Sequence, residues 1–187
     1  MELHELQLEV VRQARDHCAA LGYVEGPNWN PLEPQDPVAA LAMARFLIGS
    51  DRFDHFLAVA PEGHAYGFFF ERLGARVLSV FVDYPPRLVT QAEGLAAVAG
   101  GRVLLIEDDV ASGMSLRLVL AALESHPPAS VSLYLGRLGD GQCSKNVPEV
   151  VAEVYLAETH LNPFDRSRHE AEFVQEFGAG TTKLRSR

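Results

Sequence analysis

The stretch VLLIEDDVASGMSL, residues 103–116, passes from an apolar strand-like run through three acidic residues into a small, hydroxyl-rich turn and then into helix-like sequence. Adjacent carboxylates at the end of a buried strand repel one another and are costly to desolvate. The stretch therefore predicts a positive group, or several hydroxyl groups, opposite Glu107, Asp108 and Asp109.

The sequence on both sides of this stretch alternates between strand-like and helix-like patterns. Apolar runs predict strands at 55–60, 76–84, 101–107 and 130–136, and helical spacing predicts helices at 64–74 and 115–126. Residues 90–101 are expected to form a short helix or a structured loop. Near-continuous apolar strands separated by helices are typical of a parallel sheet covered on both faces, so the predicted fold class is α/β.

The two ends of the chain depart from this alternation. Residues 3–21 carry one apolar helical stripe, and Gly22 is a plausible stop. The stripe consists of Leu6, Val10, Ala14, Cys18 and Leu21. Asp36 is expected to cap a helix that Pro37 opens, and residues 147–161 to supply a strand or two. Residues 165–178 read as a capped helix.

We expect a single domain over residues 1–187. Its core would span about 36–140, and a small cap, or hood, over one end of the sheet would come from about 1–35 and 141–180. The length of 187 residues suits one sizeable core.

Composition excludes several classes of function. The net charge of −9 argues against a general nucleic-acid or membrane-surface binder. Cys18 and Cys143 form no disulfide framework or C-x-x-C pair, which suits a reducing cytoplasm. No segment approaches the roughly 18 uninterrupted apolar residues of a membrane span. A soluble cytoplasmic protein is expected.

The turn after the acidic residues has the chemistry of a phosphate site. Ligands of open parallel sheets bind beyond the carboxyl ends of the strands. Ala111, Ser112 and Gly113 are small enough for backbone amides to face outward, and Ser112 and Ser115 add hydroxyl groups. Amide donors and a helix N-terminus both favour an anion. The neighbouring carboxylates suit ribose hydroxyls, or a Mg²⁺ ion that bridges to a polyanionic ligand.

Residues 103–116 resemble the signature of the type I phosphoribosyltransferases, which is an apolar strand, an acidic pair and a short phosphate loop. The resemblance implies a Rossmann-like parallel sheet with a hood. It also implies that Glu107 and Asp108 hold the ribose of phosphoribosyl pyrophosphate and, directly or through ligand or water, Mg²⁺. The loop for the 5′-phosphate would be Ala111, Ser112, Gly113, Met114 and Ser115.

Residues 56–80 are similar to a second element of that family, in which a strand, a pyrophosphate-binding loop and a helix follow one another. The similarity places Glu62, Gly63 and His64 at the pyrophosphate loop. Gly63 would permit the strained peptide that such loops often contain.

Three positions depart from the family pattern. Asp83 and Tyr84 lie where many members carry a cation, and the expected catalytic loop is short, with Arg87 its only interior cation. Ala111 stands where some purine-using members have a carboxylate. Arg87 and His64 are the candidates for stabilising the leaving group, and the acceptor base stays open.

The function implied by the resemblance is that of a Mg²⁺-dependent pentosyltransferase, a phosphoribosyltransferase of nucleotide metabolism that forms or breaks an N-glycosidic bond. Its ligand would be phosphoribosyl pyrophosphate or a nucleoside monophosphate. No nucleic acid or membrane is expected as a partner, and the protein could form a homodimer. The alternative is a non-catalytic relative that binds a phosphoribosyl ligand for regulation. We expect Asp108 to be an exposed strand-end carboxylate that contributes little to packing.

Each candidate residue also has a simpler explanation. The acidic residues can be solvated caps, residues 62–64 a plain turn, His64 a surface residue and Arg87 an ordinary surface arginine. Residues 136–141 lack the G-x-G-x-x-G spacing and read as a turn. His160 and His169 have no cysteine partners, so zinc is not expected there.

Overall fold

The fold is a six-stranded, mostly parallel sheet in the strand order β3-β2-β1-β4-β5-β6. The computed structural model describes residues 2–23, 32–83, 87–88, 95–137 and 146–178. The strands are β1 (His55–Ala60), β2 (Val77–Asp83), β3 (Arg87–Leu88), β4 (Arg102–Glu107), β5 (Ser130–Leu135) and β6 (Val154–Leu156). Every neighbouring pair is parallel except β2 and β3. The predicted α/β fold class is confirmed.

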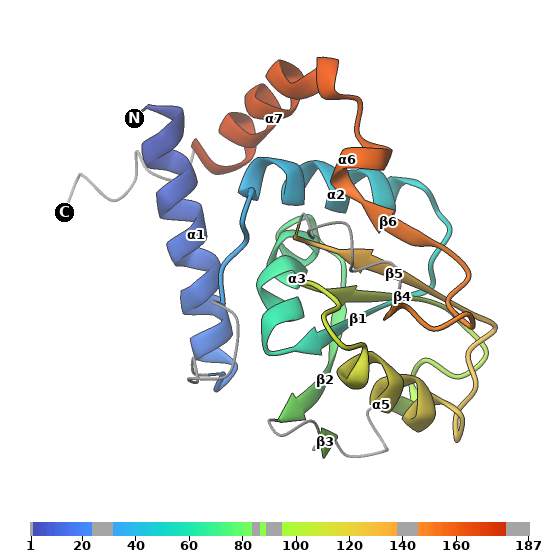
Figure 1. Ribbon diagram of the computed structural model, residues 1–187. Coiled ribbons are helices and arrows are strands. Elements are labelled where there is room, and N and C mark those ends of the chain that lie inside the picture. The colour runs from blue at the N-terminus through green and yellow to red at the C-terminus, as the bar shows by residue number, and fades with distance from the viewer. Residues whose placement is uncertain (1, 24–31, 84–86, 89–94, 138–145, 179–187) are drawn as a thin grey trace.

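Helices cover both faces of the sheet, as predicted (Figure 1). The described helices are α1 (Leu3–Ala20), α2 (Pro37–Gly49), α3 (Glu62–Arg72), α5 (Met114–Leu123), α6 (Ala157–His160), η2 (Pro163–Asp165) and α7 (Arg166–Gly178). Side chains alternate between the faces of β4, so Leu104 and Ile106 join the core beneath α2 and α3. Val103 and Leu105 join the core on the α5 side.

Helix α1 packs through the predicted apolar stripe. Leu6, Val10, Ala14 and Cys18 are all buried, whereas Leu21 is 48% exposed. The helix ends at Ala20, so Leu21 lies beyond the periodic stripe and turns to solvent.

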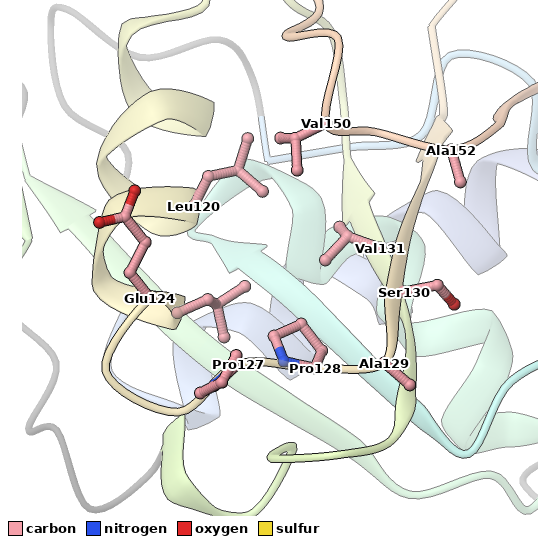
Figure 2. Close-up of a pocket in the computed structure, with 10 residues that line it drawn as sticks. Leu120, Glu124, Pro127, Pro128, Ala129, Ser130, Val131, Val150 and Ala152 are labelled. Atoms are coloured by element: carbon pink, nitrogen blue, oxygen red, sulfur yellow. The ribbon is translucent and has the colours of Figure 1, made fainter.

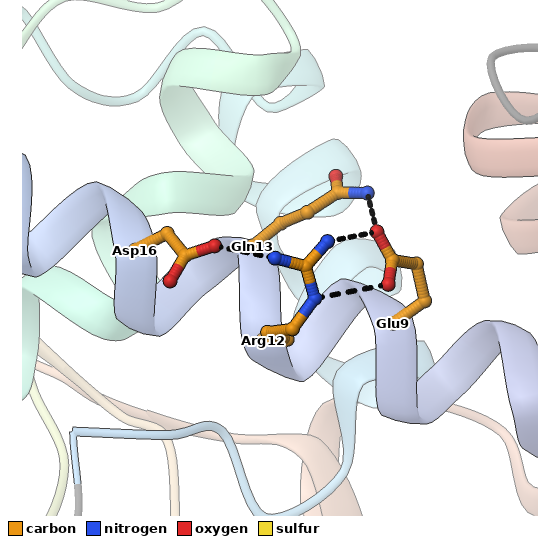
Figure 3. Close-up of polar contacts among 4 residues, drawn as sticks. All are labelled: Glu9, Arg12, Gln13 and Asp16. Carbon is orange, nitrogen blue, oxygen red and sulfur yellow. Dashed lines mark hydrogen bonds and ion pairs between the residues drawn. The ribbon is translucent and has the colours of Figure 1, made fainter. Parts of the chain in front are cut away.

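The opposite face of α1 carries a polar network (Figure 3). Arg12 donates to Glu9 at 2.7 Å and to Asp16 at 2.8 Å, and Gln13 donates to Glu9 at 3.0 Å. Exposed ion pairs of this kind contribute little to stability. The apolar stripe, and not this network, therefore sets how α1 docks.

Helix α2 begins as the sequence predicts. The Asp36 carboxylate accepts hydrogen bonds from the backbone N–H groups of Val38 (3.1 Å) and Ala39 (3.0 Å), and Pro37 is the first helical residue. The Asp36 carboxylate also pairs with Arg166 at 2.6 Å, which ties the start of α2 to the start of α7.

The described parts of the two chain ends lie on the same face of the sheet. Helix α7 contacts both α1 and α2 (Figure 1). Its predicted helical stretch is confirmed, and Phe173 and Phe177 are its buried aromatic residues. The division into a core and a hood stays a prediction.

Some predicted features lie outside the described residues. They are residues 90–94 of the segment 90–101, residues 138–141, Tyr84 and Cys143. From the rest of that segment, Leu95 and Val98 are buried in the core on the α5 side. None of the described helices has the length and apolar character that crossing a bilayer requires.

Candidate functional site

The carboxyl ends of β1, β4 and β5 meet at one edge of the sheet. The register pairs Ala58 of β1 with Ile106, and Glu107 with Leu135 of β5. The pairing continues past the strands, because the N–H of Gly136 donates to the Glu107 carbonyl at 2.9 Å and that of Arg137 to the Asp108 carbonyl at 2.7 Å. The predicted acidic residues therefore lie where the connections to α3 and α5 begin.

Glu107 lies in an electrostatically unfavourable environment. Its Oε2 atom is buried and has no hydrogen-bond partner among the described residues. Burial raises the pKa of Glu107 well above its ordinary value, and the nearby charges of Asp108, Glu62 and Asp109 raise the pKa further. A carboxylate in this setting is stabilised by a cation or by hydroxyl donors.

Asp108 lies inside the protein, with only 4% of its surface exposed, so the expected exposed carboxylate is wrong. Its Oδ1 accepts from the backbone N–H of Asp109 at 2.7 Å, and its Oδ2 lies 3.2 Å from Nε of Arg137. The positive group expected opposite the acidic residues is thus present for Asp108. Sequence reasoning missed Arg137, although a cation directly after the neighbouring strand was the available signal.

Replacing Asp108 with asparagine is expected to lower the free energy of unfolding by about 1.5 kcal/mol, because Arg137 would lose its anionic partner in a largely dry site. Differential scanning calorimetry should show a melting temperature roughly 3–6 °C lower. Asp16→Asn is the matched control, since Asp16 belongs to the exposed network of α1. An unchanged melting temperature for Asp108→Asn would show that the ion pair contributes nothing.

The turn that we predicted to bind a phosphate leads directly into α5. Ala111, Ser112 and Met114 are exposed, and Gly113 precedes the helix with a φ of 72°. The Ser112 hydroxyl accepts from the Met114 N–H at 3.3 Å, as a capping side chain does. The turn and the first amides of a ten-residue helix therefore follow the acidic pair directly, which is an arrangement suited to an anion.

One side of this turn is covered by Asn146. The Asn146 amide donates to the Ala111 carbonyl at 2.5 Å. A side chain at Gly113 would collide with the Asn146 carbonyl, which explains why Gly113 is buried while its neighbours are exposed. The Arg117 guanidinium, from the first turns of α5, donates to the Ser112 carbonyl at 2.5 Å and fixes the turn against the helix.

Residues Glu62, Gly63 and His64 form the first turn of α3 and not a separate loop. Gly63 does not have a left-handed backbone conformation. A Cβ atom there would instead collide with the Ile106 carbonyl and lie 3.0 Å from Oε2 of Glu107. The structure therefore brings Gly63 and Glu107 together, and close approach rather than backbone strain accounts for the glycine.

The His64 side chain is buried between α3, α1 and β2. Its Nδ1 lies 2.8 Å from the Ser79 hydroxyl, and its ring stacks on that of His17 with 5.3 Å between centroids. Burial lowers the pKa of His64 to about 4, and His17 adds to the effect. The His64 ring thus lies among α1, β2, Tyr23 and Glu71 of its own helix, and its role at the pyrophosphate site stays a prediction.

Arg87 lies on the edge strand β3 and is not placed beside the acidic pair. Its guanidinium donates to Asp83 at 2.7 Å. Strands β2 and β1 lie between β3 and β4, a span of three strand spacings, or roughly 14 Å. Its predicted catalytic role stays a prediction.

A cavity of about 390 Å³ adjoins the acidic strand end and was not foreseen from the sequence. Gly136 lies on its wall, together with the start of α2 and residues of α6 and α7. Asp36, Glu158, Asn162, Arg166 and His169 supply its polar groups. Neither ring nitrogen of His169 has a hydrogen-bond partner among the described residues, and both nitrogens are buried.

A second hollow, of about 490 Å³, lies where β5 begins, at the opposite edge of the sheet from Glu107 (Figure 2). Leu120, Leu123, Pro127 and Pro128 give it an apolar wall. Glu124 is the one acidic residue on that wall. The hollow therefore has no part in the chemistry of the acidic pair.

No family model matches the sequence, and no curated protein matches it. Several solved structures are similar. A hypothetical protein from Neisseria gonorrhoeae with bound ppGpp is 13% identical, and the match covers 72% of this chain and 90% of that chain at a TM-score of 0.44. The hypoxanthine-guanine phosphoribosyltransferase of L. donovani is 17% identical, over 65% of this chain and 82% of that chain, with a TM-score of 0.44.

A hypoxanthine-guanine-xanthine phosphoribosyltransferase is 19% identical, over 65% of this chain and 76% of that chain, with a TM-score of 0.42. Two of these three proteins are phosphoribosyltransferases.

Proposed function

We propose that the protein is a phosphoribosyltransferase that transfers the phosphoribosyl group between phosphoribosyl pyrophosphate and a nucleobase-like acceptor. The proposal rests on one observation. Two carboxylates at the buried end of β4 lead directly into an exposed turn at the N-terminus of α5. Carboxylates suited to sugar hydroxyls are thereby followed directly in the chain by a turn and a helix N-terminus suited to a phosphate.

In this proposal Glu107 and Asp108 hold the ribose hydroxyls, and residues Ala111–Ser115 hold the 5′-phosphate. Glu62, Gly63 and His64 lie on the pyrophosphate side. The absence of a side chain at Gly63 supports this, because the backbone of α3 approaches Glu107 closely there.

The residues at the strand end fit a Mg²⁺ ion. Oε2 of Glu107 is a buried oxygen that has no hydrogen-bond partner in the described part of the chain, and Asp108, Glu62 and Asp109 add negative charge around it. Oxygen ligands of this kind, together with the ligand's own phosphates, are those that Mg²⁺ prefers. When bound, the ion would neutralise charge on the pyrophosphate.

Cleavage at the ribose C1 atom leaves a cationic sugar and a highly charged leaving group, so the protein's contribution would be positioning and electrostatic stabilisation. The carboxylates fix the ribose, and the turn fixes its phosphate. The cavity beside Gly136 adjoins the acidic pair and is the place we assign to the acceptor base.

The proposed activity predicts base-dependent release of pyrophosphate when the protein is mixed with phosphoribosyl pyrophosphate, Mg²⁺ and a panel of purines, pyrimidines and simple amines. Glu107→Gln should reduce this release at least about 100-fold, as the loss of a preorganised electrostatic contact does. Glu124→Gln, at the far hollow, is the matched control and should keep the wild-type rate.

Two outcomes would contradict the proposal. Calorimetric binding of phosphoribosyl pyrophosphate without turnover on any base would identify a non-catalytic phosphoribosyl-binding protein. Absence of binding would exclude phosphoribosyl pyrophosphate as a ligand of this protein.

A further inference from the structure

Two histidines and a glutamate converge between α1 and α3, and of these three residues only His64 also belongs to the proposed transfer site. His17 lies near the end of α1, and His64 and Glu71 lie on one side of α3, two helical turns apart. One ligand atom from each of the three lies within 4.8 Å of the other two. The cluster therefore presents two imidazole nitrogens and a carboxylate toward a common point.

The separations in this cluster suit a small cation better than hydrogen bonds. Nε2 of His17 lies 2.8 Å from Oε2 of Glu71, yet it has no hydrogen-bond partner of acceptable geometry. Nε2 of His64 lies 3.9 Å from Oε1 of Glu71, which is too far for a hydrogen bond. Ligands about 2.1 Å from a tetrahedral ion lie roughly 3.4 Å apart, between these two values.

The environment of His64 strengthens this interpretation. The residue is 2% exposed, and its buried Nε2 has no hydrogen-bond partner within the described ranges, which costs about 1–3 kcal/mol if nothing binds there. Its other ring nitrogen contacts the Ser79 hydroxyl at 2.8 Å. Histidines that bind metals are commonly oriented in this way, with the second nitrogen hydrogen-bonded to a neighbouring group.

An ordinary ion pair between His17 and Glu71 explains only part of the cluster. Even a pair that satisfied His17 would leave the buried Nε2 of His64 without a hydrogen-bond partner among the described residues. A bound ion satisfies all three side chains. The side chains of His17 and Glu71 are 26% and 31% exposed, so the ion would have a path from solvent.

We propose that His17, His64 and Glu71 form a binding site for a divalent transition-metal ion of the Zn²⁺ type. Two imidazoles and one carboxylate are a donor set that favours Zn²⁺ over Mg²⁺. The fourth position is open to water. The ion ties α1 to α3, the helix whose first turn carries Glu62 and Gly63.

The test uses the full chain without a histidine tag, stripped with a chelator and then titrated with Zn²⁺ in a calorimeter. The wild type should bind one equivalent at this site, and Zn²⁺ should raise its melting temperature. Co²⁺ should give the strong visible absorption of tetrahedral coordination, and excess Mg²⁺ should not displace the ion.

His17→Gln and Glu71→Gln should each weaken Zn²⁺ binding at least tenfold. Ser79→Ala should weaken it about tenfold, because Ser79 acts through the orientation of His64. His4→Gln is the matched control, since His4 is exposed on the same helix, and it should bind as the wild type does. Circular dichroism verifies that each variant folds.

Three results would overturn the site. They are no stoichiometric binding of Zn²⁺ by the wild type, equal affinity of His17→Gln and His4→Gln, and displacement of the ion by Mg²⁺. If His17→Gln fails to fold, the Zn²⁺ affinities of Ser79→Ala and Glu71→Gln are compared with that of His4→Gln instead.

Discussion

Gly63→Ala is expected to lower the free energy of unfolding by about 3 kcal/mol, which is the upper end of the cost of overpacking a dense core. The added methyl group would collide with the Ile106 carbonyl, and that carbonyl belongs to a central strand paired on both sides. Thermal denaturation should show a melting temperature roughly 6–12 °C lower. Because α3 must move away from β4, we also expect base-dependent pyrophosphate release to fall.

Gly49→Ala is the matched control. Gly49 is the last residue of α2, and no atom lies within 4 Å of the place where its Cβ would be. Alanine should therefore leave stability unchanged or raise it by about 0.5 kcal/mol. Equal melting temperatures for the two variants would contradict the close approach of α3 to β4.

The second large effect concerns Glu107, whose removal should stabilise the protein while it abolishes activity. Glu107→Gln removes a charge that burial and three neighbouring acidic residues make unfavourable. We expect the free energy of unfolding at pH 7.5 to rise by about 2 kcal/mol, because a buried, uncompensated charge is costlier than a neutral amide in the same place. The melting temperature should rise by roughly 4–8 °C. Such an exchange of stability for activity is typical of functional sites.

The pH dependence of the stability difference between Glu107→Gln and the wild type provides a further test. The folded-state pKa of Glu107 lies above its ordinary value of 4.5, so the folded protein holds the proton more tightly than the unfolded chain. Stability from this group is therefore complete below pH 4.5 and is lost as the pH rises through the folded-state pKa. The advantage of Glu107→Gln over the wild type should accordingly vanish near pH 4.

Glu124→Gln serves as the control at both pH values, and its melting temperature should follow that of the wild type. If Glu107→Gln were less stable than the wild type at pH 7.5, the Glu107 carboxylate would have a stabilising partner. That result would contradict the electrostatic strain inferred at the strand end.

Sequence reasoning succeeded where the signal is local. The strand that ends at Glu107, the turn that opens α5 and the cap at Asp36 are each specified by a few consecutive residues, because strand period and capping chemistry act over that range. The apolar stripe of α1 was predicted correctly for the same reason. The predicted burial is wrong only for Leu21, which lies after the end of the helix.

The features that were missed depend on how distant segments pack. Arg137 lies beside Asp108 only because β5 pairs with β4 in a particular register. The contact of His17 with Glu71 requires α1 to dock on α3, and the cavity beside Gly136 requires three helices to meet. No spacing within one segment encodes these contacts, so Asp108 was expected at the surface.

The ring of Tyr66 lies against the backbone of Gly136, where any larger residue would collide with it. The Tyr66 hydroxyl accepts a hydrogen bond from the N–H of Gln35, and Tyr66 stands one helical turn after Glu62. One rigid aromatic side chain of α3, the helix that carries the proposed pyrophosphate site, thus packs against the wall of the cavity that we assign to the acceptor base. Because a protein interior is close-packed, a displacement of α3 would also displace the wall of this cavity. The pyrophosphate side and the acceptor side of the proposed reaction would therefore stay aligned with each other.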